Sequence, residues 1–188
     1  DERFPALKHG RWIGIGISSG NRLKELGKDK LIDLASRLLA LAPDIRIALV
    51  GAPADSRLAG ELLAALQATN TAGDRLLDTA GQVPLARLAA LIDRFRLYVG
   101  VDSGVTYLAD ARGVPVVDIM GPADPEDQRP TGERALIIRR DLPCAPCSHA
   151  FRAPYACATG TRACILETDT NDVIAAIQKG LFDETRGI

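Results

Sequence analysis

Short apolar runs alternate along this 188-residue chain with longer stretches in which apolar residues recur every three or four positions. The runs are typical of buried strands, and the recurring positions are typical of helices that bury one face. We expect strands at residues 12–17, 45–50, 76–78, 97–101, 114–120 and 135–138. We expect helices around residues 31–41, 58–66, 85–92, 105–111 and 171–181. This alternation predicts an α/β protein with a Rossmann-like parallel sheet and helices on both faces.

Polar residues follow the expected strand 97–101 directly, before the next helix begins. Asp102 and Ser103 are good helix N-caps, and Gly104 lets another group approach the backbone closely. In an open parallel sheet, ligands bind where the strands end, beside helix N-termini that attract anions. We therefore expect the binding site at this turn. The alternative is that Asp102 only caps the helix and has no contact with a ligand.

Two known motifs resemble parts of the chain but do not fit. Gly14, Gly16 and Gly20 resemble a dinucleotide fingerprint, yet the spacing is too long and the first two glycines fall inside a strand. We expect these two to allow tight packing of the strand. The turn at Asp102 also resembles a nucleophile elbow, whose hydrolase chemistry needs a downstream histidine. His149 is the only histidine after Asp102 in the sequence, and it lies in a loop segment.

The loop after the first strand combines hydroxyl groups with positive charge. Ser18, Ser19, Arg22 and Lys24 precede a helix, which is an arrangement suited to a ligand that bears phosphate. For Arg22, a solvated surface position is an equally good interpretation.

All four cysteines fall within one window near the end of the chain. Cys144 and Cys147 have the Cys-x-x-Cys spacing of tetrahedral zinc ligands, and Cys157 and Cys164 can complete the set. A structural zinc site is one hypothesis. The alternatives are a plain loop shaped by prolines, or an oxidised pair. We expect His149 to be a loop residue rather than a metal ligand.

Composition limits the class of protein. Apolar residues make up 47% and charged residues 25%, and the formal net charge of −1 gives no basic field for nucleic acid. No apolar run reaches the roughly 18 residues of a spanning helix. We expect one large domain at residues 12–188. Residues 1–11 carry no periodic pattern and are expected to be an interdomain linker or tail, with a missing partner domain before them.

Several segments together resemble the carboxyl-terminal half of the lipopolysaccharide heptosyltransferases, glycosyltransferase family 9. They are DSGVTYLA at 102–109, GVPVV at 113–117, GPADP at 121–125 and DLPCAPC at 141–147. The resemblance implies one half of a GT-B fold, whose carboxyl-terminal domain binds a nucleotide-sugar, typically ADP-heptose. It also implies that an absent amino-terminal domain holds a lipid-linked saccharide acceptor and the catalytic base. The implied reaction inverts the anomeric centre and requires no metal or other cofactor.

The expected donor site combines the polar loops above with the residues that match the family. Lys24 matches a lysine that contacts donor phosphate, and residues 102–104 match a turn around the diphosphate and sugar. Asp55 and Val83 match only loosely, near the ribose and the adenine. The expected donor-binding residues are Ser18, Ser19, Lys24, Asp55, Val83, Asp102, Ser103, Gly104 and Tyr107.

Two residues depart from the family pattern. Tyr107 stands where the family usually has histidine, and Asp110 stands where it has a small apolar residue. Tyrosine can donate a hydrogen bond but carries no positive charge, so the sugar or the nucleotide can differ from ADP-heptose. Because a carboxylate repels a diphosphate, we expect Asp102 to cap the helix or to hold a sugar hydroxyl.

The resemblance thus implies a cytoplasmic glycosyltransferase fragment, which we expect to bind a donor but not to turn over alone. No catalytic residue is expected on this chain. The full-length protein could associate peripherally with the inner face of the cell membrane. A non-catalytic nucleotide-binding or interaction module on the same fold is the alternative.

Overall fold

A single parallel sheet forms the centre of the computed structural model, which describes residues 4–69 and 72–181. Its strands run in the order β3-β2-β1-β4-β5-β6. The strands are β1 (Arg11–Gly16), β2 (Ile45–Val50), β3 (Leu76–Asp78), β4 (Leu97–Val101), β5 (Val116–Met120) and β6 (Ala135–Arg139). The order reverses between β1 and β4, and such a reversal opens a crevice at the carboxyl ends of the strands. The expected Rossmann-like sheet is confirmed.

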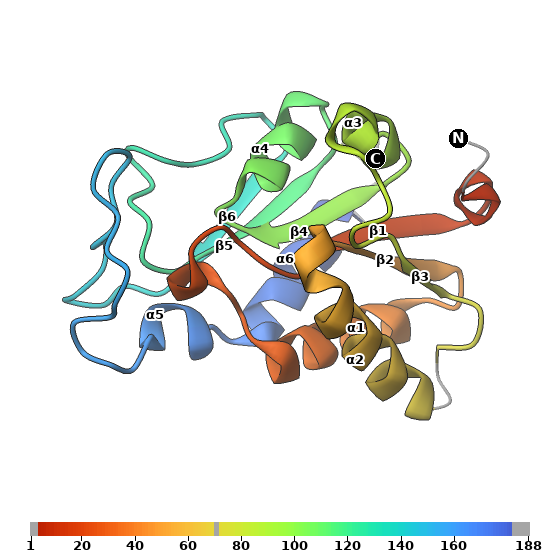
Figure 1. Cartoon of the computed structure of the whole chain (residues 1–188), viewed down its shortest axis with the longest axis horizontal. Helices are drawn as coiled ribbons and strands as arrows, with labels where there is room; N and C mark the ends of the chain where they lie inside the picture. Colours follow the sequence, from red (N-terminus) through yellow and green to blue (C-terminus); the bar gives the residue numbers. More distant parts are fainter. Residues whose placement is uncertain (1–3, 70–71, 182–188) are drawn as a thin grey trace.

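Helices cover both faces of the sheet (Figure 1). One face carries α1 (Lys28–Leu41), α2 (Ser56–Ala68) and α6 (Thr170–Leu181). The other face carries α3 (Leu85–Ile92) and α4 (Gly104–Ala111). All five match expected helices. Short helices that the sequence did not predict are η1 (Pro5–Lys8), η2 (Arg22–Lys24), η3 (Pro53–Asp55) and α5 (Ala163–Leu166).

The glycines of β1 allow two aromatic rings to lie directly on the strand. A Cβ atom added at Gly14 would lie 2.5 Å from the ring of Phe95, and one added at Gly16 would lie 2.3 Å from the Tyr98 hydroxyl oxygen. Both rings belong to the core between the sheet and α3 and α4. The expectation that these two glycines serve tight packing is therefore confirmed.

The segment before β1 packs against the same core. The indole N–H of Trp12 donates to the carbonyls of Ala6 at 3.1 Å and His9 at 2.9 Å. Phe4 and Leu7 are buried beside the Trp12 ring. The division of the chain into a linker at 1–11 and a domain at 12–188 stays a prediction, and residues 1–3 and 182–188 lie outside the described part.

A carboxyl group lies within the core at Asp118, in the middle of β5. Its side chain is fully buried, and neither of its oxygens has a hydrogen-bond partner among the described residues. Burial and, secondly, the negative charge of Asp102 raise the pKa of Asp118 to about 8, against the opposing effect of Lys24. Asp118 is therefore largely protonated at neutral pH, since burial favours the uncharged form of a carboxyl group.

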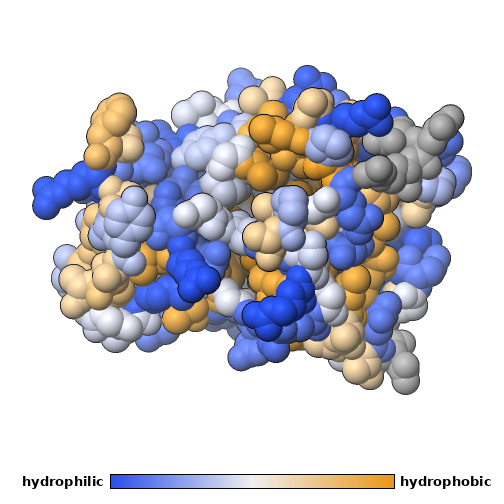
Figure 2. Space-filling model, viewed as in Figure 1, coloured by the Kyte–Doolittle hydropathy of each residue, from blue (hydrophilic) through white to orange (hydrophobic). Residues whose placement is uncertain are grey.

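The surface is mixed in character. Figure 2 shows hydrophilic side chains interspersed with apolar ones over one face, with an apolar patch beside α3 and α4. Leu85, the first residue of α3, is an exposed aliphatic side chain, at 83%. Within the described ranges, no helix has both the length and the apolar character that crossing a bilayer requires.

We expect alanine substitutions at Gly14 in β1 and at Gly60 in α2 to have opposite effects on the free energy of unfolding. Gly14→Ala forces a methyl group into the Phe95 ring, and overpacking of this kind should lower the free energy of unfolding by about 1–3 kcal/mol. Gly60→Ala is the matched control, because a Cβ there meets nothing within 4 Å. Since Gly60 lies within α2, alanine should raise the stability by about 0.5–1 kcal/mol. Urea denaturation measures both, and equal stability of the two variants would contradict the packing described.

Because Asp118 is buried, we expect the free energy of unfolding of the protein to fall as the pH rises. Its pKa in the folded protein is raised, so between about pH 4 and pH 8 the folded state holds a proton that the unfolded state has lost. The contribution of Asp118 should therefore fall by up to about 1.4 kcal/mol per pH unit in this window. The groups that interact with it electrostatically are Tyr98 in β4, Asp102 directly after β4, Lys24 in η2 and Tyr107 in α4.

Asp118→Asn removes this titration while keeping the shape of the side chain. Relative to the unmodified protein, the variant should gain stability progressively from pH 5 to pH 8, as measured by urea denaturation at each pH. A difference that stays constant across this range would show that Asp118 is ionised in the folded protein.

Candidate functional site

A buried carboxylate lies at the carboxyl end of β4, where the strand order reverses between β1 and β4. The side chain of Asp102 is only 3% exposed and forms an ion pair with the ammonium group of Lys24. The Tyr107 hydroxyl donates to the other carboxylate oxygen at 2.7 Å. Burial and, secondly, the hydrogen bond to Asp102 raise the pKa of Tyr107, so its phenol stays protonated and available as a donor. The three side chains form one connected group, here called the Asp102 cluster.

Two different segments bring Lys24 and Tyr107 to Asp102. Lys24 is the last residue of η2, whose first turn is capped by Asn21 through a 3.0 Å hydrogen bond from the Leu23 N–H. The adjoining Leu23 is buried and fixes this turn against the protein. Tyr107 projects from the first turns of α4. The cluster therefore ties the loop after β1 to the helix after β4.

Ser103, rather than Asp102, is the N-cap of α4. Its hydroxyl oxygen accepts the Thr106 N–H at 3.5 Å, and the Thr106 hydroxyl donates to the Val101 carbonyl at 2.6 Å. The expectation that Asp102 caps the helix is therefore wrong. The helix begins one residue later than that role requires, which leaves the Asp102 carboxylate facing Lys24.

A second group of hydrogen bonds joins the ends of β1, β2 and β4. The Ser18 hydroxyl donates to Asp55 at 2.6 Å, and Asp55 also accepts the Ala52 N–H at 2.7 Å. The Ser19 hydroxyl donates to the Asp102 carbonyl at 3.5 Å. Asp55, expected near a ribose, thus holds the β1 loop against the β2 loop in this structure.

The loop before α3 reaches the same edge of the sheet. The Gly81 N–H donates to the Gly51 carbonyl at 3.0 Å, and a Cβ at Gly81 would lie 2.7 Å from the backbone of Pro53. Gly81 has a φ of +70°, a conformation that favours glycine. Val83 lies two residues beyond this contact and is partly buried against the core of α3 and α4.

The expected donor-binding residues thus share one edge of the sheet. Gly104 is the first residue of α4 and is exposed, with open space where a side chain would be. Arg22 is also exposed, which fits a solvated position as well as a ligand contact. Their roles in binding stay predictions, because their geometry alone does not identify a ligand.

Asp110, the second departure from the family pattern, has a structural partner. Its carboxylate accepts the backbone N–H groups of Thr131 at 3.0 Å and Gly132 at 3.1 Å. It therefore anchors the loop between β5 and β6. A small apolar residue at this position could not make these bonds.

The cysteine window contains free thiols beside a histidine–carboxylate cluster. None of Cys144, Cys147, Cys157 and Cys164 is in a disulfide bond. His149 lies on a loop, as expected, with Nδ1 3.1 Å from Asp124 and 3.3 Å from Asp127. These three side chains could also hold a metal ion.

Comparisons with known proteins agree with this architecture. The sequence model of glycosyltransferase family 9 (heptosyltransferase) matches residues 33–154. Lipopolysaccharide heptosyltransferase 1 of Pseudomonas aeruginosa is 31% identical over 115 residues, which are 61% of this chain and 30% of that protein.

Two solved structures show the same fold. ADP-heptose lps heptosyltransferase II of E. coli has a TM-score of 0.78 and 22% identity, over 98% of this chain and 50% of that one. TibC of enterotoxigenic E. coli, a dodecameric iron-containing heptosyltransferase in complex with ADP-D-beta-D-heptose, has a TM-score of 0.65 and 18% identity. That match covers 95% of this chain and 47% of TibC, so this chain spans about half the length of either structure.

The family match extends from α1 to the loop that carries the first two cysteines. It includes β4, the turn at Asp102 and the whole of α4, whereas the loop after β1, with Ser18, Ser19 and Lys24, lies before the matched residues. Because the match covers well over half of the sequence, the chain belongs to glycosyltransferase family 9, the heptosyltransferases.

Proposed function

We propose that this chain is the donor-binding half of an inverting heptosyltransferase. It binds a nucleotide-sugar, ADP-heptose or a related donor, from which the heptose passes to a lipopolysaccharide-core acceptor. The observation that carries the proposal is the Asp102 cluster at the sheet reversal, beside the N-terminus of an eight-residue helix. Support for the donor comes from TibC, a relative of the same fold that was solved with ADP-D-beta-D-heptose.

The site must stabilise the negative charge of the leaving group, which for a nucleotide-sugar is the nucleoside diphosphate. Negative charge grows on the diphosphate as the glycosidic bond breaks, and fixed positive charge and N–H dipoles stabilise it without reorganisation. Lys24 supplies the charge. The first backbone N–H groups of α4 supply the dipoles, because the N–H groups of a helical first turn have no acceptor within the helix.

Asp102 acts in this scheme as a positioning residue. Its carboxylate accepts from both Lys24 and Tyr107, so these two side chains reach the edge of the sheet with a defined geometry. The Lys24 side chain remains 13% exposed, and a lysine ammonium has three N–H donors, so it can contact phosphate while it keeps its bond to Asp102.

Tyr107 makes the site less positive than one with a protonated histidine. A neutral phenol donates one hydrogen bond and contributes no charge to a diphosphate. We therefore expect Lys24 to provide a larger share of the phosphate binding here. We also expect the site to tolerate a donor whose sugar or nucleotide differs from that of ADP-heptose.

The acceptor and the catalytic base belong, in this proposal, to an amino-terminal domain. Transfer requires a general base within hydrogen-bond reach of the acceptor hydroxyl. Closure of two domains around the donor would exclude water and bring that base to the sugar. No metal ion or other cofactor takes part in the transfer. A cytoplasmic location, with access to a membrane-bound acceptor, fits this reaction and stays a prediction.

Replacing Lys24 tests the proposed phosphate contact. Lys24→Ala should weaken binding of ADP and ADP-heptose by about 1.5–3 kcal/mol, the range for a hydrogen bond to a charged group. Isothermal calorimetry measures the affinity, and Lys28→Ala is the control because Lys28 pairs with Glu61 on the protein surface. The double variant Lys24→Ala/Asp102→Asn avoids leaving a buried carboxylate without its cation. Unchanged affinity in a folded variant would remove Lys24 from the site.

Measuring donor binding and sugar transfer separately tests whether this chain binds the donor while the amino-terminal domain supplies the catalytic base. The chain alone should bind ADP-heptose with a Kd in the micromolar to millimolar range, about −8 to −4 kcal/mol. With donor and a lipopolysaccharide-core acceptor, it should form no product by mass spectrometry, whereas the full-length protein should. Transfer by the chain alone at a similar rate would place the base on this chain. Failure of both proteins to bind any nucleotide-sugar would overturn the proposal.

A further inference from the structure

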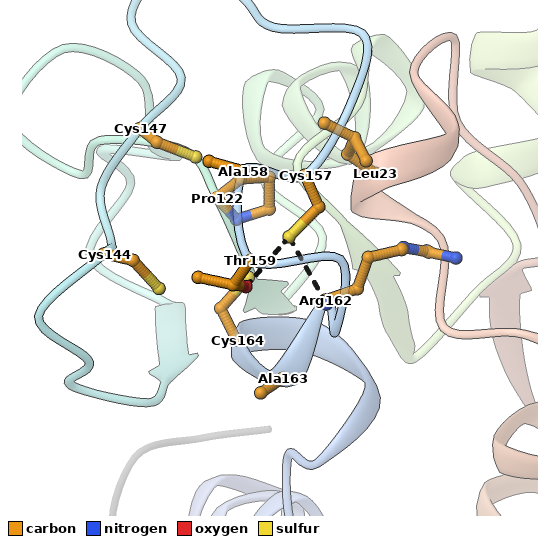
Figure 3. A pocket seen from close by; sticks show the side chains of 10 residues that line it. All are labelled: Leu23, Pro122, Cys144, Cys147, Cys157, Ala158, Thr159, Arg162, Ala163 and Cys164. Atoms are coloured by element: carbon orange, nitrogen blue, oxygen red, sulfur yellow. Dashed lines mark hydrogen bonds between the residues drawn. The ribbon is translucent and has the colours of Figure 1, made fainter.

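A cavity lies at the edge of the sheet opposite to the candidate donor site. It has a volume of about 260 Å³ and lies where α3 and α4 end and where β4 and β5 begin. The cysteine side chains drawn in Figure 3 surround a different cavity, which Leu23 of η2 also lines. Arg96 precedes β4 and Asp102 follows it, so about 20 Å of strand separates the two edges.

Three arginines from separate segments line this cavity. Arg96 lies between α3 and β4, Arg112 directly follows α4, and Arg134 directly precedes β6. Of the described residues that line the cavity, only Asp93 is acidic, so positive charge is in excess there. The volume is just below the roughly 300–1,000 Å³ of pockets for drug-sized ligands, which suits a small anion.

Two of these arginines bond to the protein, whereas Arg96 does not. Arg112 donates from Nε and Nη2 to the two oxygens of Asp93, at 2.8 Å each. Arg134 donates from Nη2 to the Gly113 carbonyl. The Arg96 side chain has no hydrogen bond or ion pair among the described residues. Its guanidinium therefore has all five N–H donors available.

The loop that carries Arg134 is held in place by Asp110. The Asp110 carboxylate accepts the N–H groups of Thr131 and Gly132, and a Cβ atom at Gly132 would collide with this carboxylate. Arg134 follows two residues later and reaches the end of α4 at Gly113. Asp110 thus gives the cavity one of its walls, and the proposed donor site does not use this residue.

Positive charge at this edge also has a structural explanation. The last carbonyls of α3 and α4 lie here, and the C-terminus of a helix attracts cations. Arg112 and Arg134 serve this purpose through their bonds at the ends of the two helices. Arg96 does not, because its side chain bonds to neither helix. The helix ends therefore account for two of the three arginines.

We propose that this cavity binds the phosphate group of a small phosphomonoester or of an anionic lipid headgroup, with Arg96 as the principal contact. The planar fork of a guanidinium matches two phosphate oxygens. Arg112 and Arg134 each keep N–H donors that their present bonds do not use. All three arginines are exposed, so an anion reaches them directly from solvent. The inference does not rest on the proposed function.

A phosphate titration followed by NMR locates the site. Inorganic phosphate is added to the isotope-labelled chain, and the backbone N–H signals of Arg96, Gly113 and Arg134 should shift saturably with one common Kd. Sodium chloride at the same ionic strength is the control for general screening of charge, and it should not reproduce these shifts. The signals of Lys24 and Asp102 report separately on phosphate at the donor edge.

Substitutions of Arg96 test its contact with the phosphate. Arg96→Ala should raise the Kd for phosphate about ten- to a hundredfold, as expected for the loss of a hydrogen bond to a charged group. Arg96→Lys keeps the charge without the planar fork, so its Kd should fall between the two. Arg87→Ala is the matched control and should leave the Kd nearly unchanged, because Arg87 is an exposed arginine of α3 outside the cavity lining. All three variants should keep the Tm of the unmodified protein.

Two further probes distinguish the source of the phosphate. Glycerol phosphate is a soluble phosphomonoester, and vesicles of equimolar phosphatidylcholine and phosphatidylglycerol present an anionic lipid headgroup. Binding of glycerol phosphate that Arg96→Ala weakens, without sedimentation of the protein on vesicles, would assign the site to a soluble ligand. Sedimentation on vesicles that Arg96→Ala abolishes and Arg87→Ala preserves would assign it to a lipid surface. Both outcomes support the proposal.

Three results would overturn the proposal. The first is the lack of saturable shifts at Arg96, Gly113 and Arg134 with phosphate up to about 10 mM. The second is a Kd that Arg96→Ala leaves unchanged, and the third is a set of phosphate-induced shifts confined to the donor edge. A protein that binds phosphate at Arg96 but binds no nucleotide-sugar would contradict the proposed function alone.

Discussion

The charge of Asp102 is the constraint on which the carboxyl edge of the sheet depends. An ionised carboxylate that is almost completely removed from water must be compensated by opposite charge and hydrogen bonds. Lys24 and Tyr107 provide this compensation. Because they arrive on the loop after β1 and on α4, satisfying one carboxylate fixes three segments relative to each other. Removing one partner from such a pair costs about 3–5 kcal/mol. The order of this edge therefore follows from local electrostatics as much as from the core beneath it.

The long elements could be predicted because periodicity over many residues leaves little ambiguity. The bounds of β2 and β4 agree with the apolar runs residue for residue, and all five long helices appear where the spacing indicates. Short elements could not be predicted in this way. One turn such as α5 holds too few residues to show a period, and it forms because Cys164 and Ile165 are buried. The N-cap of α4 is Ser103 and not Asp102, a choice that the sequence leaves open because both residues are good caps and only the end of β4 decides between them.

The candidate site could be located from the sequence, but its internal contacts could not. Residues after β1 and β4 must meet at one edge of a parallel sheet, and this topology brings Lys24 and Asp102 together. The ion pair between Lys24 and Asp102 was not predicted. The sequence does not show that the Asp102 carboxylate is buried, and it is this burial that makes a neighbouring cation necessary. Asp118 was missed for a related reason. One polar residue inside an apolar run does not interrupt the strand pattern, and only the structure reveals that its carboxyl group has no hydrogen-bond partner among the described residues.

Trp12 gives the segment before β1 an optical signal of its own. It is the only tryptophan of the chain, and its indole ring is buried with its N–H bonded to two carbonyls of that segment. The guanidinium of Arg46 lies 5.8 Å from the ring centroid. Detachment of the segment would expose the indole to water and break both hydrogen bonds while the sheet stayed intact. Tryptophan fluorescence would then change before the far-ultraviolet circular dichroism does, so the docking of these first residues can be followed separately from global unfolding.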